Sequence, residues 1–298
     1  MEDRAASILV KLKNKAVKSE IPYQQCLQLF DQEEFLRKLS HSFYANNLVL
    51  KGGLFIYALT NFKSRPTMDV DFLLSGYPNT LNDIKIMIDT ILNVNTGNDF
   101  ISMSVLNFEP ITKQRKYPGI SVQIFCKIKN VRIYFNVDIG VGDIIFPKVE
   151  KRTIATQLTT FEPPVINTYS LESTIAEKLD AIIERLELTS RMKDFYDIYY
   201  LSKTFNFDGL KLKEAIIRTL NVRNTYFDKD TFKHIDELKD NERMNNQRKK
   251  FLENFNITEL SFFAVIRTIN DFLGPVLASI ISDSKWDFRW NSEIGWIK

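Results

Sequence analysis

Two periodicities divide this chain into two parts. Between residues 48 and 139, apolar and polar residues alternate in short stretches. Alternate side chains of a strand face opposite ways, so this pattern predicts strands with one buried face. A turn at Lys129-Asn130 would join the two clearest stretches as a hairpin. We expect strands over 48–50, 68–74, 101–108, 119–129 and 131–139.

Apolar residues recur every three or four positions in most other stretches, which predicts amphipathic helices. In the first half these helices cover 5–17, 22–43, 54–60 and 80–93. After Pro163-Pro164 they cover 171–187, 190–203, 208–220, 229–240 and 258–273, and Gly274-Pro275 is expected to end the last one. The pattern therefore predicts an α/β (α+β) domain over 1–162 and a mostly helical domain over 163–298.

The candidate chemistry is concentrated in residues 47–74. The pair Gly52 and Gly53 directly follows the first predicted strand and opens a helix, so backbone N–H groups could approach an anion there. In the next strand, Asp69 and Asp71 share the polar face, and two adjacent carboxylates repel unless a cation lies between them. Oxygen ligands suit Mg²⁺. Each feature alone is more typical of a tight turn or a solvated strand face, but together they suggest a nucleotide site.

Three further charged residues could join this site. Asp138 lies on the polar face of the last predicted strand, and it can converge with Asp69 if the two strands are neighbours; otherwise it is a solvated carboxylate. Lys178 flanks an apolar helix stripe, so its ammonium could reach a cleft or extend into solvent. Asp194 shares a helix face with apolar residues and needs a partner unless it serves the helix N-terminus. Asp197 competes with Asp194 for any role.

Composition limits the class of protein. The chain has 298 residues, 44% of them hydrophobic, with 10 Gly and 9 Pro, which is typical of a globular protein. A net charge of +3 indicates no strong general attraction to nucleic acid. Two cysteines and two histidines exclude a disulfide framework and a histidine-rich metal cage. The start Met-Glu-Asp-Arg differs from a signal peptide, and no apolar run reaches the ~20 residues of a membrane span, so we expect a cytoplasmic protein with no membrane contact.

Five motifs, taken together and in order, resemble those of the AbiEii/AbiGii toxin family. That family comprises nucleotidyltransferase-like proteins of bacterial toxin–antitoxin and abortive infection systems. The resemblance covers about residues 20 to 205. The motifs are Lys51-Gly-Gly-Leu, Arg65-Pro-Thr-Met-Asp69-Val-Asp71, Val137-Asp138-Ile-Gly-Val-Gly-Asp143, Glu177-Lys178-Leu and Lys193-Asp194-Phe-Tyr-Asp197.

The resemblance implies a DNA polymerase beta-like nucleotidyltransferase core with a mixed sheet, followed by a helical C-terminal domain. It implies that Asp69 and Asp71 bind the metal, Mg²⁺ or Mn²⁺, and that Asp138 is the third metal-binding acid. Lys178 would contact the nucleotide phosphates, and Asp194 would be the later essential acid. The residues implied to bind the nucleoside triphosphate are Lys51, Gly52, Gly53, Arg65 and Lys178.

One departure from the family pattern concerns the position after the glycine pair. Related enzymes often carry Ser or Thr there, where a hydroxyl helps to hold phosphate, whereas this chain has Leu54. The difference puts a side-chain phosphate contact in doubt, but not the contact from the backbone.

The leading hypothesis is a metal-dependent nucleotidyltransferase toxin. It would transfer a nucleotide from a nucleoside triphosphate to an acceptor, with tRNA as the first choice, and so inhibit growth or phage propagation. The resemblance also implies a cognate antitoxin as partner. Three alternatives stay open: a small-molecule or protein-hydroxyl acceptor, a glycosyltransferase that uses its Asp-x-Asp pair for a nucleotide sugar, and a nucleotide-binding or interaction protein without catalysis.

Overall fold

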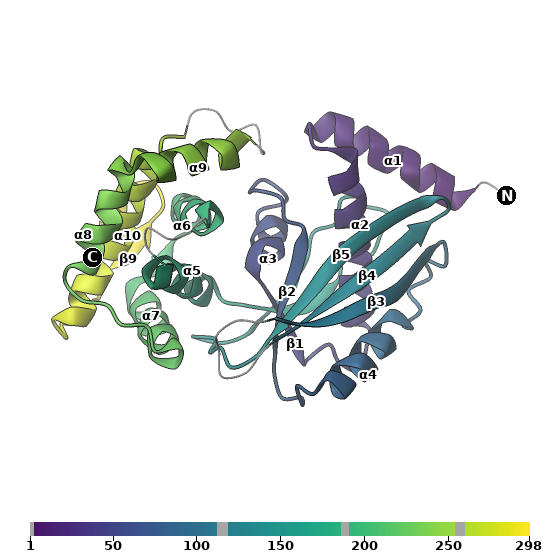
Figure 1. Ribbon diagram of the computed structural model, residues 1–298, viewed down its shortest axis with the longest axis horizontal. Helices are drawn as coiled ribbons and strands as arrows, with labels where there is room; N and C mark the ends of the chain where they lie inside the picture. Colours follow the sequence, from purple (N-terminus) through teal and green to yellow (C-terminus); the bar gives the residue numbers. More distant parts are fainter. Residues whose placement is uncertain (1–2, 112–118, 186–190, 254–259) are drawn as a thin grey trace. The chain divides into compact units, whose positions relative to one another are not determined.

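The chain forms two compact units in the computed structural model, which describes residues 3–111, 119–185, 191–253 and 260–298 (Figure 1). Unit 1 comprises Met1–Gly142 and Val149–Tyr169, and unit 2 comprises Asp143–Lys148 and Ser170–Lys298. The units therefore divide at Tyr169, beyond the expected boundary at 162, and unit 2 also takes a short segment of the first half. The predicted helix ends at 186–187, 190 and 258–259 lie outside the described residues.

Unit 1 is built on a seven-stranded mixed sheet with the order β3-β4-β5-β2-β1-β7-β6. Two neighbouring pairs, β2–β5 and β1–β7, are parallel, and the other pairs are antiparallel. The five predicted strands are all present, and the α/β fold class is confirmed. They are β1 (Leu48–Lys51), β2 (Asp69–Leu74), β3 (Ile101–Ile111), β4 (Gly119–Ile128) and β5 (Val131–Gly140). Two short strands were not predicted, β6 (Glu150–Thr153) and β7 (Val165–Thr168).

Helices cover one face of this sheet. The apolar sides of β2, β4 and β5 face α2 (Tyr23–Ser40), where the ring of Phe35 lies 6.1 Å from Phe72 and 6.2 Å from Phe135. Helix α4 (Leu81–Leu92) packs against β3 and α2, and α1 (Arg4–Ser19) packs on α2 (Figure 1). The short helix α3 (Gly52–Leu59) follows β1 directly and contacts β1 and β2. The opposite face of β3, β4 and β5 therefore carries the polar residues of the alternating pattern.

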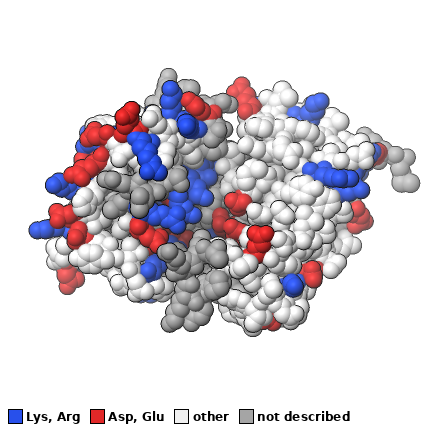
Figure 2. Space-filling view, in the orientation of Figure 1, with Lys and Arg blue, Asp and Glu red and all other residues white. Residues whose placement is uncertain are grey.

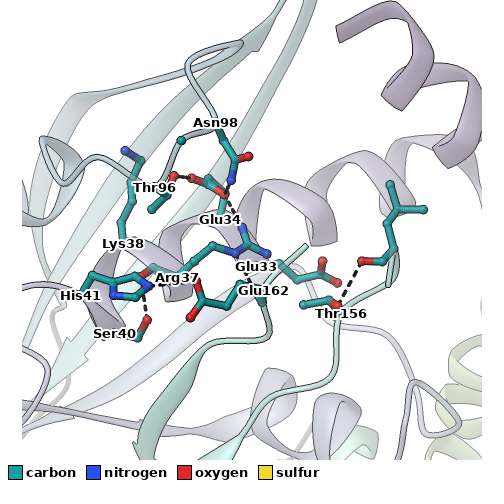
Figure 3. Close-up of polar contacts among 12 residues, drawn as sticks. Glu33, Glu34, Arg37, Lys38, Ser40, His41, Thr96, Asn98, Thr156 and Glu162 are labelled. Carbon is teal, nitrogen blue, oxygen red and sulfur yellow. Dashed lines mark hydrogen bonds and ion pairs between the residues drawn. The ribbon is translucent and has the colours of Figure 1, made fainter. Parts of the chain in front are cut away.

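Helix α2 is buried on almost every side, although its sequence contains many polar residues. Its Glu34 binds Arg37 and Thr96 and accepts a hydrogen bond from Asn98 Nδ2 at 2.8 Å (Figure 3). Arg37 Nε in turn donates to the carbonyl of Glu162 at 2.8 Å. These bonds satisfy polar groups that would otherwise be costly to bury. They also attach the loop after α4 and the chain before β7 to the central helix of unit 1.

Unit 2 is mostly helical, as predicted, with a small sheet of three short strands. Helix α10 does not end at Gly274-Pro275, so that prediction was wrong. Phe272, Leu273, Val276 and Leu277 are all buried, and their packing on both sides of the proline stabilises a continuous helix. The elements are α5 (Leu171–Arg185), α6 (Met192–Thr204), β8 (Phe207–Asp208), α7 (Gly209–Arg223), α8 (Thr231–Glu237), a 3₁₀ turn (Leu238–Asp240), α9 (Glu242–Glu253), α10 (Phe262–Ile281), β9 (Arg289–Asn291) and β10 (Gly295–Ile297).

The C-terminal segment packs back onto unit 2 through its tryptophans. Trp290 Nε1 donates to the carbonyl of Ser202 at 2.7 Å, and Trp296 Nε1 donates to the carbonyl of Phe272 at 3.0 Å. The ring of Phe272 lies 4.8 Å from that of Trp290. These indole N–H groups thus have partners despite their apolar surroundings.

Helix α10 alone, within the described part of the chain, is long and apolar enough to cross a membrane by length and composition. Its apolar stripe, which includes Ile266, Ile269 and Leu273, is buried. The helix packs against α6, α7 and α8 within unit 2. Its charged residues, Arg267 and Asp271, lie on the exposed side. This pattern is typical of a core helix in a globular unit.

Candidate functional site

The predicted acids come together because of strand order. Strand β5 is the parallel neighbour of β2, so the condition for convergence is met. Asp71 is in register with Asp138, and Asp69 is in register with Asn136. Residues in register on adjacent strands have side chains on the same face. Asp69, Asp71 and Asp138 therefore share the sheet face that α2 does not cover, and each is partly buried.

The glycine pair lies directly against this acid group. Gly52 has φ +69°, a left-handed conformation that favours glycine, and a Cβ atom there would lie 2.1 Å from Asp71 Oδ2. A Cβ atom on Gly53 would lie 2.7 Å from Thr67 Oγ1 and 3.4 Å from an Arg65 guanidinium nitrogen. The absence of side chains thus lets the backbone at the start of α3 approach a carboxylate, a hydroxyl and a guanidinium. The first N–H groups of a helix have no partner within the helix and carry partial positive charge, which suits a phosphate.

Thr67 is a candidate site residue that the sequence analysis missed. Leu54, the departure from the family pattern, is only 1% exposed and packs in the core, so it leaves no hydroxyl at that position. Thr67 instead brings a hydroxyl to the neighbouring Gly53 from the chain before β2. The available signal was its place in the Arg65-to-Asp69 motif, but only the tertiary structure shows that this motif lies over the glycine pair.

Lys51 and Arg65 both lie beside the glycine pair in unit 1. Lys51 is in register with Asp71 on the adjacent antiparallel strand, and its ammonium lies 5.2 Å from the centre of the Tyr169 ring. Arg65 is only 7% exposed, so its guanidinium is held within the site. Positive charge near two carboxylates lowers the cost of bringing them together. The structure therefore brings together the four residues predicted to hold the nucleotide in unit 1.

The donor set fits a magnesium or manganese ion. Asp69 and Asp71 offer carboxylate oxygens on one face of β2, and Asp138 Oδ1 accepts a hydrogen bond from Ser121 Oγ at 2.5 Å. Within residues 3–111, 119–185, 191–253 and 260–298, no three acidic, histidine or cysteine side chains form a ready-made metal group. Magnesium is commonly held by one or two carboxylates together with waters and substrate phosphates. An acid pair beside a phosphate cradle suits that mode of binding.

The predicted residues of unit 2 form a buried ion cluster. Lys178, on α5, is 8% exposed, and its Nζ lies 2.6 Å from Asp197 Oδ2 and 3.1 Å from Asp194 Oδ1. It does not extend into solvent as a surface lysine would. Asp194 thus has the partner that its apolar helix face requires, and both candidate acids of α6 bind the same lysine. Arg191 lies 3.8 Å from the other oxygen of Asp194.

A second ion cluster, around Arg223 of α7, was not predicted. Its guanidinium lies 2.9 Å from Asp143, 2.8 Å from Glu177 and 2.6 Å from Asp180. The three carboxylates raise the pKa of Arg223 above its already high value and outweigh the effect of burial. Arg223 of α7 thus links Asp143 to α5, in agreement with the place of the segment Asp143–Lys148 in unit 2. No sequence pattern indicated this role, because the four residues come from three distant stretches.

Comparisons with known proteins bear on this arrangement of glycine pair and acids. Residues 34–288 match the family of nucleotidyl transferase AbiEii toxins of type IV toxin–antitoxin systems. This chain belongs to the AbiEii family. The match covers most of the chain and includes every motif on which the resemblance was based. It makes the protein a nucleotidyltransferase of a toxin family, and the family implies a nucleoside triphosphate substrate and a cognate antitoxin.

One solved structure with a TM-score above 0.5 supports a nucleotidyltransferase fold. MenT4, a nucleotidyltransferase toxin from Mycobacterium tuberculosis, is 15% identical, and the alignment covers 93% of this chain and 99% of MenT4 with a TM-score of 0.53. JHP933 from Helicobacter pylori is also 15% identical over 87% of this chain and 93% of its own, with a TM-score of 0.44. No curated protein matches the sequence. The predicted nucleotidyltransferase fold is thereby confirmed, while the roles of individual residues stay predictions.

Proposed function

We propose that this AbiEii-family protein transfers a nucleotide from a nucleoside triphosphate to the 3′ end of tRNA, with Mg²⁺ or Mn²⁺ bound. The observation that supports this most directly is the register of Asp71 with Asp138 beside Gly52. This register places the parts that nucleotidyl transfer needs close together at one face of the sheet. They are two acids for a metal, a backbone cradle for the phosphates, and a third acid beside the first two. Positioning and charge stabilisation are the main contributions to such chemistry.

In this proposal the glycine pair and the first N–H groups of α3 bind the triphosphate. Arg65 and Lys51 offset its negative charge, and the hydroxyl of Thr67 donates a hydrogen bond to it. Asp69 and Asp71 hold the metal, which when bound supplies positive charge to the phosphate oxygens. Asp138 orients the acceptor hydroxyl and accepts its proton as the hydroxyl oxygen bonds to the α-phosphorus. The bond between the α-phosphorus and the bridging oxygen breaks, and pyrophosphate leaves with its electron pair.

Two residues of unit 2, Lys178 and Asp194, keep their predicted roles in the proposal. Lys178 would contact the phosphates, and Asp194 would act as the later essential acid. Their mutual contact at 3.1 Å supports joint action, because each fixes the position of the other. The contact between Lys178 and Asp197 means that Asp197 shares this role.

The biological outcome that we propose is growth inhibition. Modification of tRNA in the cytoplasm would stop translation, and this would also limit phage propagation. The family name supports the toxin role, and a cognate antitoxin would neutralise it. No membrane partner is part of this proposal.

The test is transfer of label from each of four α-³²P nucleoside triphosphates to total tRNA with Mg²⁺ or Mn²⁺ present. We expect label in tRNA with the wild type and a loss of at least about 100-fold in Asp69→Asn, because a metal ligand is removed. Asp89→Asn is the matched control, since Asp89 is exposed on α4 of the same unit. Equal transfer by wild type and Asp69→Asn would refute the proposal. Label in a protein or small molecule, with none in tRNA, would show a different acceptor.

A further inference from the structure

A polar cavity lies beside Asp138, on the side away from the glycine pair. It has a volume of about 100 Å³ and is lined by Asn107, Glu109, Ser121, Gln123 and Asn136. Ser121 is in register with Asp138 and bonded to it. The acids therefore have the phosphate cradle of β1 and α3 on one side and this cavity of β3 and β4 on the other. The second substrate of a transferase needs such a place opposite the donor.

On the exposed face of β3, β4 and β5, residues in register lie side by side, so the outward side chains form rows that run across the three strands. The row nearest the acids carries three amides, Asn107, Gln123 and Asn136, which are partners across adjacent strands. The next row pairs Phe125 with Tyr134. The third pairs Lys127 with Arg132. Successive rows lie about 7 Å apart, because two residues of a strand span that distance.

Each row offers a different contact. Amides both donate and accept hydrogen bonds, as the edges of bases and ribose hydroxyls require. The rings of Phe125 and Tyr134 lie 5.3 Å apart, and Tyr134 is 48% exposed, so an aromatic surface is open to a stacking base. Lys127 and Arg132 are exposed cations that suit phosphate. On the face of unit 1 drawn in Figure 2, one group of acidic side chains lies near the middle of the view, and a band of basic side chains lies near the right edge, where further acidic side chains also lie.

We infer that this face, called here the acceptor face, binds the unpaired 3′-terminal nucleotides of an RNA acceptor. The terminal hydroxyl lies at Asp138, the terminal nucleoside at the amide row, a base on the aromatic row and the backbone phosphate at the basic row. A single strand fits better than a duplex, because stacking on the aromatic row requires an unpaired base. This inference rests on the proposed function and adds the residues that select the acceptor: Gln123, Phe125, Lys127, Arg132 and Tyr134.

The test measures binding separately from transfer. Fluorescence anisotropy would give the Kd of a labelled single-stranded RNA with a tRNA 3′ sequence, and calorimetry would give the Kd of the nucleoside triphosphate. We expect Tyr134→Ala to weaken RNA binding about tenfold, because one stacked base is lost, whereas Tyr134→Phe keeps the ring and stays near wild type. Matched controls are Tyr226→Ala and Arg267→Ala, whose side chains are 82% and 74% exposed in unit 2.

Arg132→Ala gives an independent readout. It should weaken binding and lower the slope of log Kd against log salt by about 0.7, the value for one phosphate contact on a single strand. In the transfer assay, Tyr134→Ala and Arg132→Ala should each raise the KM for the RNA acceptor. The KM for the nucleoside triphosphate should stay within about twofold of the wild-type value. Thermal unfolding would confirm that the variants are folded.

The outcomes separate the two proposals. Folded Tyr134→Ala and Arg132→Ala variants that bind RNA as the wild type does would overturn the acceptor face, even if transfer to tRNA occurs. Loss of RNA binding in both variants, without any transfer by the wild type, would support the face and refute the proposed reaction. Equal competition by a blunt RNA duplex would overturn recognition of an unpaired end.

Discussion

Substitution of Gly52 by alanine tests the closest contact in the candidate site. The left-handed φ of +69° costs an alanine about 1–2 kcal/mol of stability. The new Cβ would lie 2.1 Å from Asp71 Oδ2, whereas real Cβ atoms essentially never approach closer than 3.0 Å. The carboxylate of Asp71 must therefore move by about 0.9 Å, the difference between these two distances. A displacement of about 1 Å at a reacting centre lowers the rate by about 100-fold.

The assay combines initial rates of label transfer with urea unfolding of the same preparations. Gly97→Ala is the matched control, because Gly97 also has a left-handed φ, +73°, in unit 1, but nothing lies within 4 Å of its Cβ position. Gly97→Ala should lose about 1–2 kcal/mol of stability, and Gly52→Ala should lose at least as much, because it adds a clash with Asp71 to the same left-handed φ. Only Gly52→Ala should lose activity. A folded Gly52→Ala protein with more than about a third of the wild-type rate would refute the reasoning. So would an equal loss of rate in Gly97→Ala.

Two further predictions concern buried charges. Lys178→Met leaves Asp194 and Asp197 buried without their cation. It should therefore lower the free energy of unfolding, measured in urea, by about 3–5 kcal/mol. A loss below about 1 kcal/mol would contradict the view that Lys178 neutralises these two acids in the folded protein. Burial raises the pKa of Glu33 from 4.5 to about 8. Between these pH values the carboxyl of Glu33 stays protonated in the folded protein but is ionised in the unfolded chain. Stability should therefore fall as pH rises from about 5 to 8, and Glu33→Gln should flatten this dependence; parallel curves would contradict it.

Alternation and helical spacing predicted much of the fold, because both depend on which face of an element is buried. The hairpin of β4 and β5 alternates over its whole length, and its core side is buried as expected. The short strands β6 and β7 were missed, since Glu150–Thr153 has no apolar alternation and lies at the sheet edge. The break at Gly274-Pro275 was wrong because tertiary packing on both sides of a proline can outweigh its local cost.

The sequence by itself determined the chemical parts of the candidate site. Spacing placed Asp69 and Asp71 on one strand face and a glycine pair at the start of a helix, because the periods of strands and helices are local properties. Strand and helix spacing also singled out Asp138, Lys178 and Asp194, and the family motifs added their predicted roles. The local pattern also required a partner for Asp194 without indicating which residue it was.

Only the tertiary structure decided which of these parts meet. The parallel pairing of β2 with β5 sets Asp71 against Asp138, and a shift of one residue would turn Asp138 to the opposite face. Packing likewise brought Thr67 over Gly53, Lys178 between two acids, and an amide row beside Asp138. Strand order and register depend on burial across the whole sheet, between residues far apart in the chain. A local pattern carries no information about such neighbours, so the structure alone could show them.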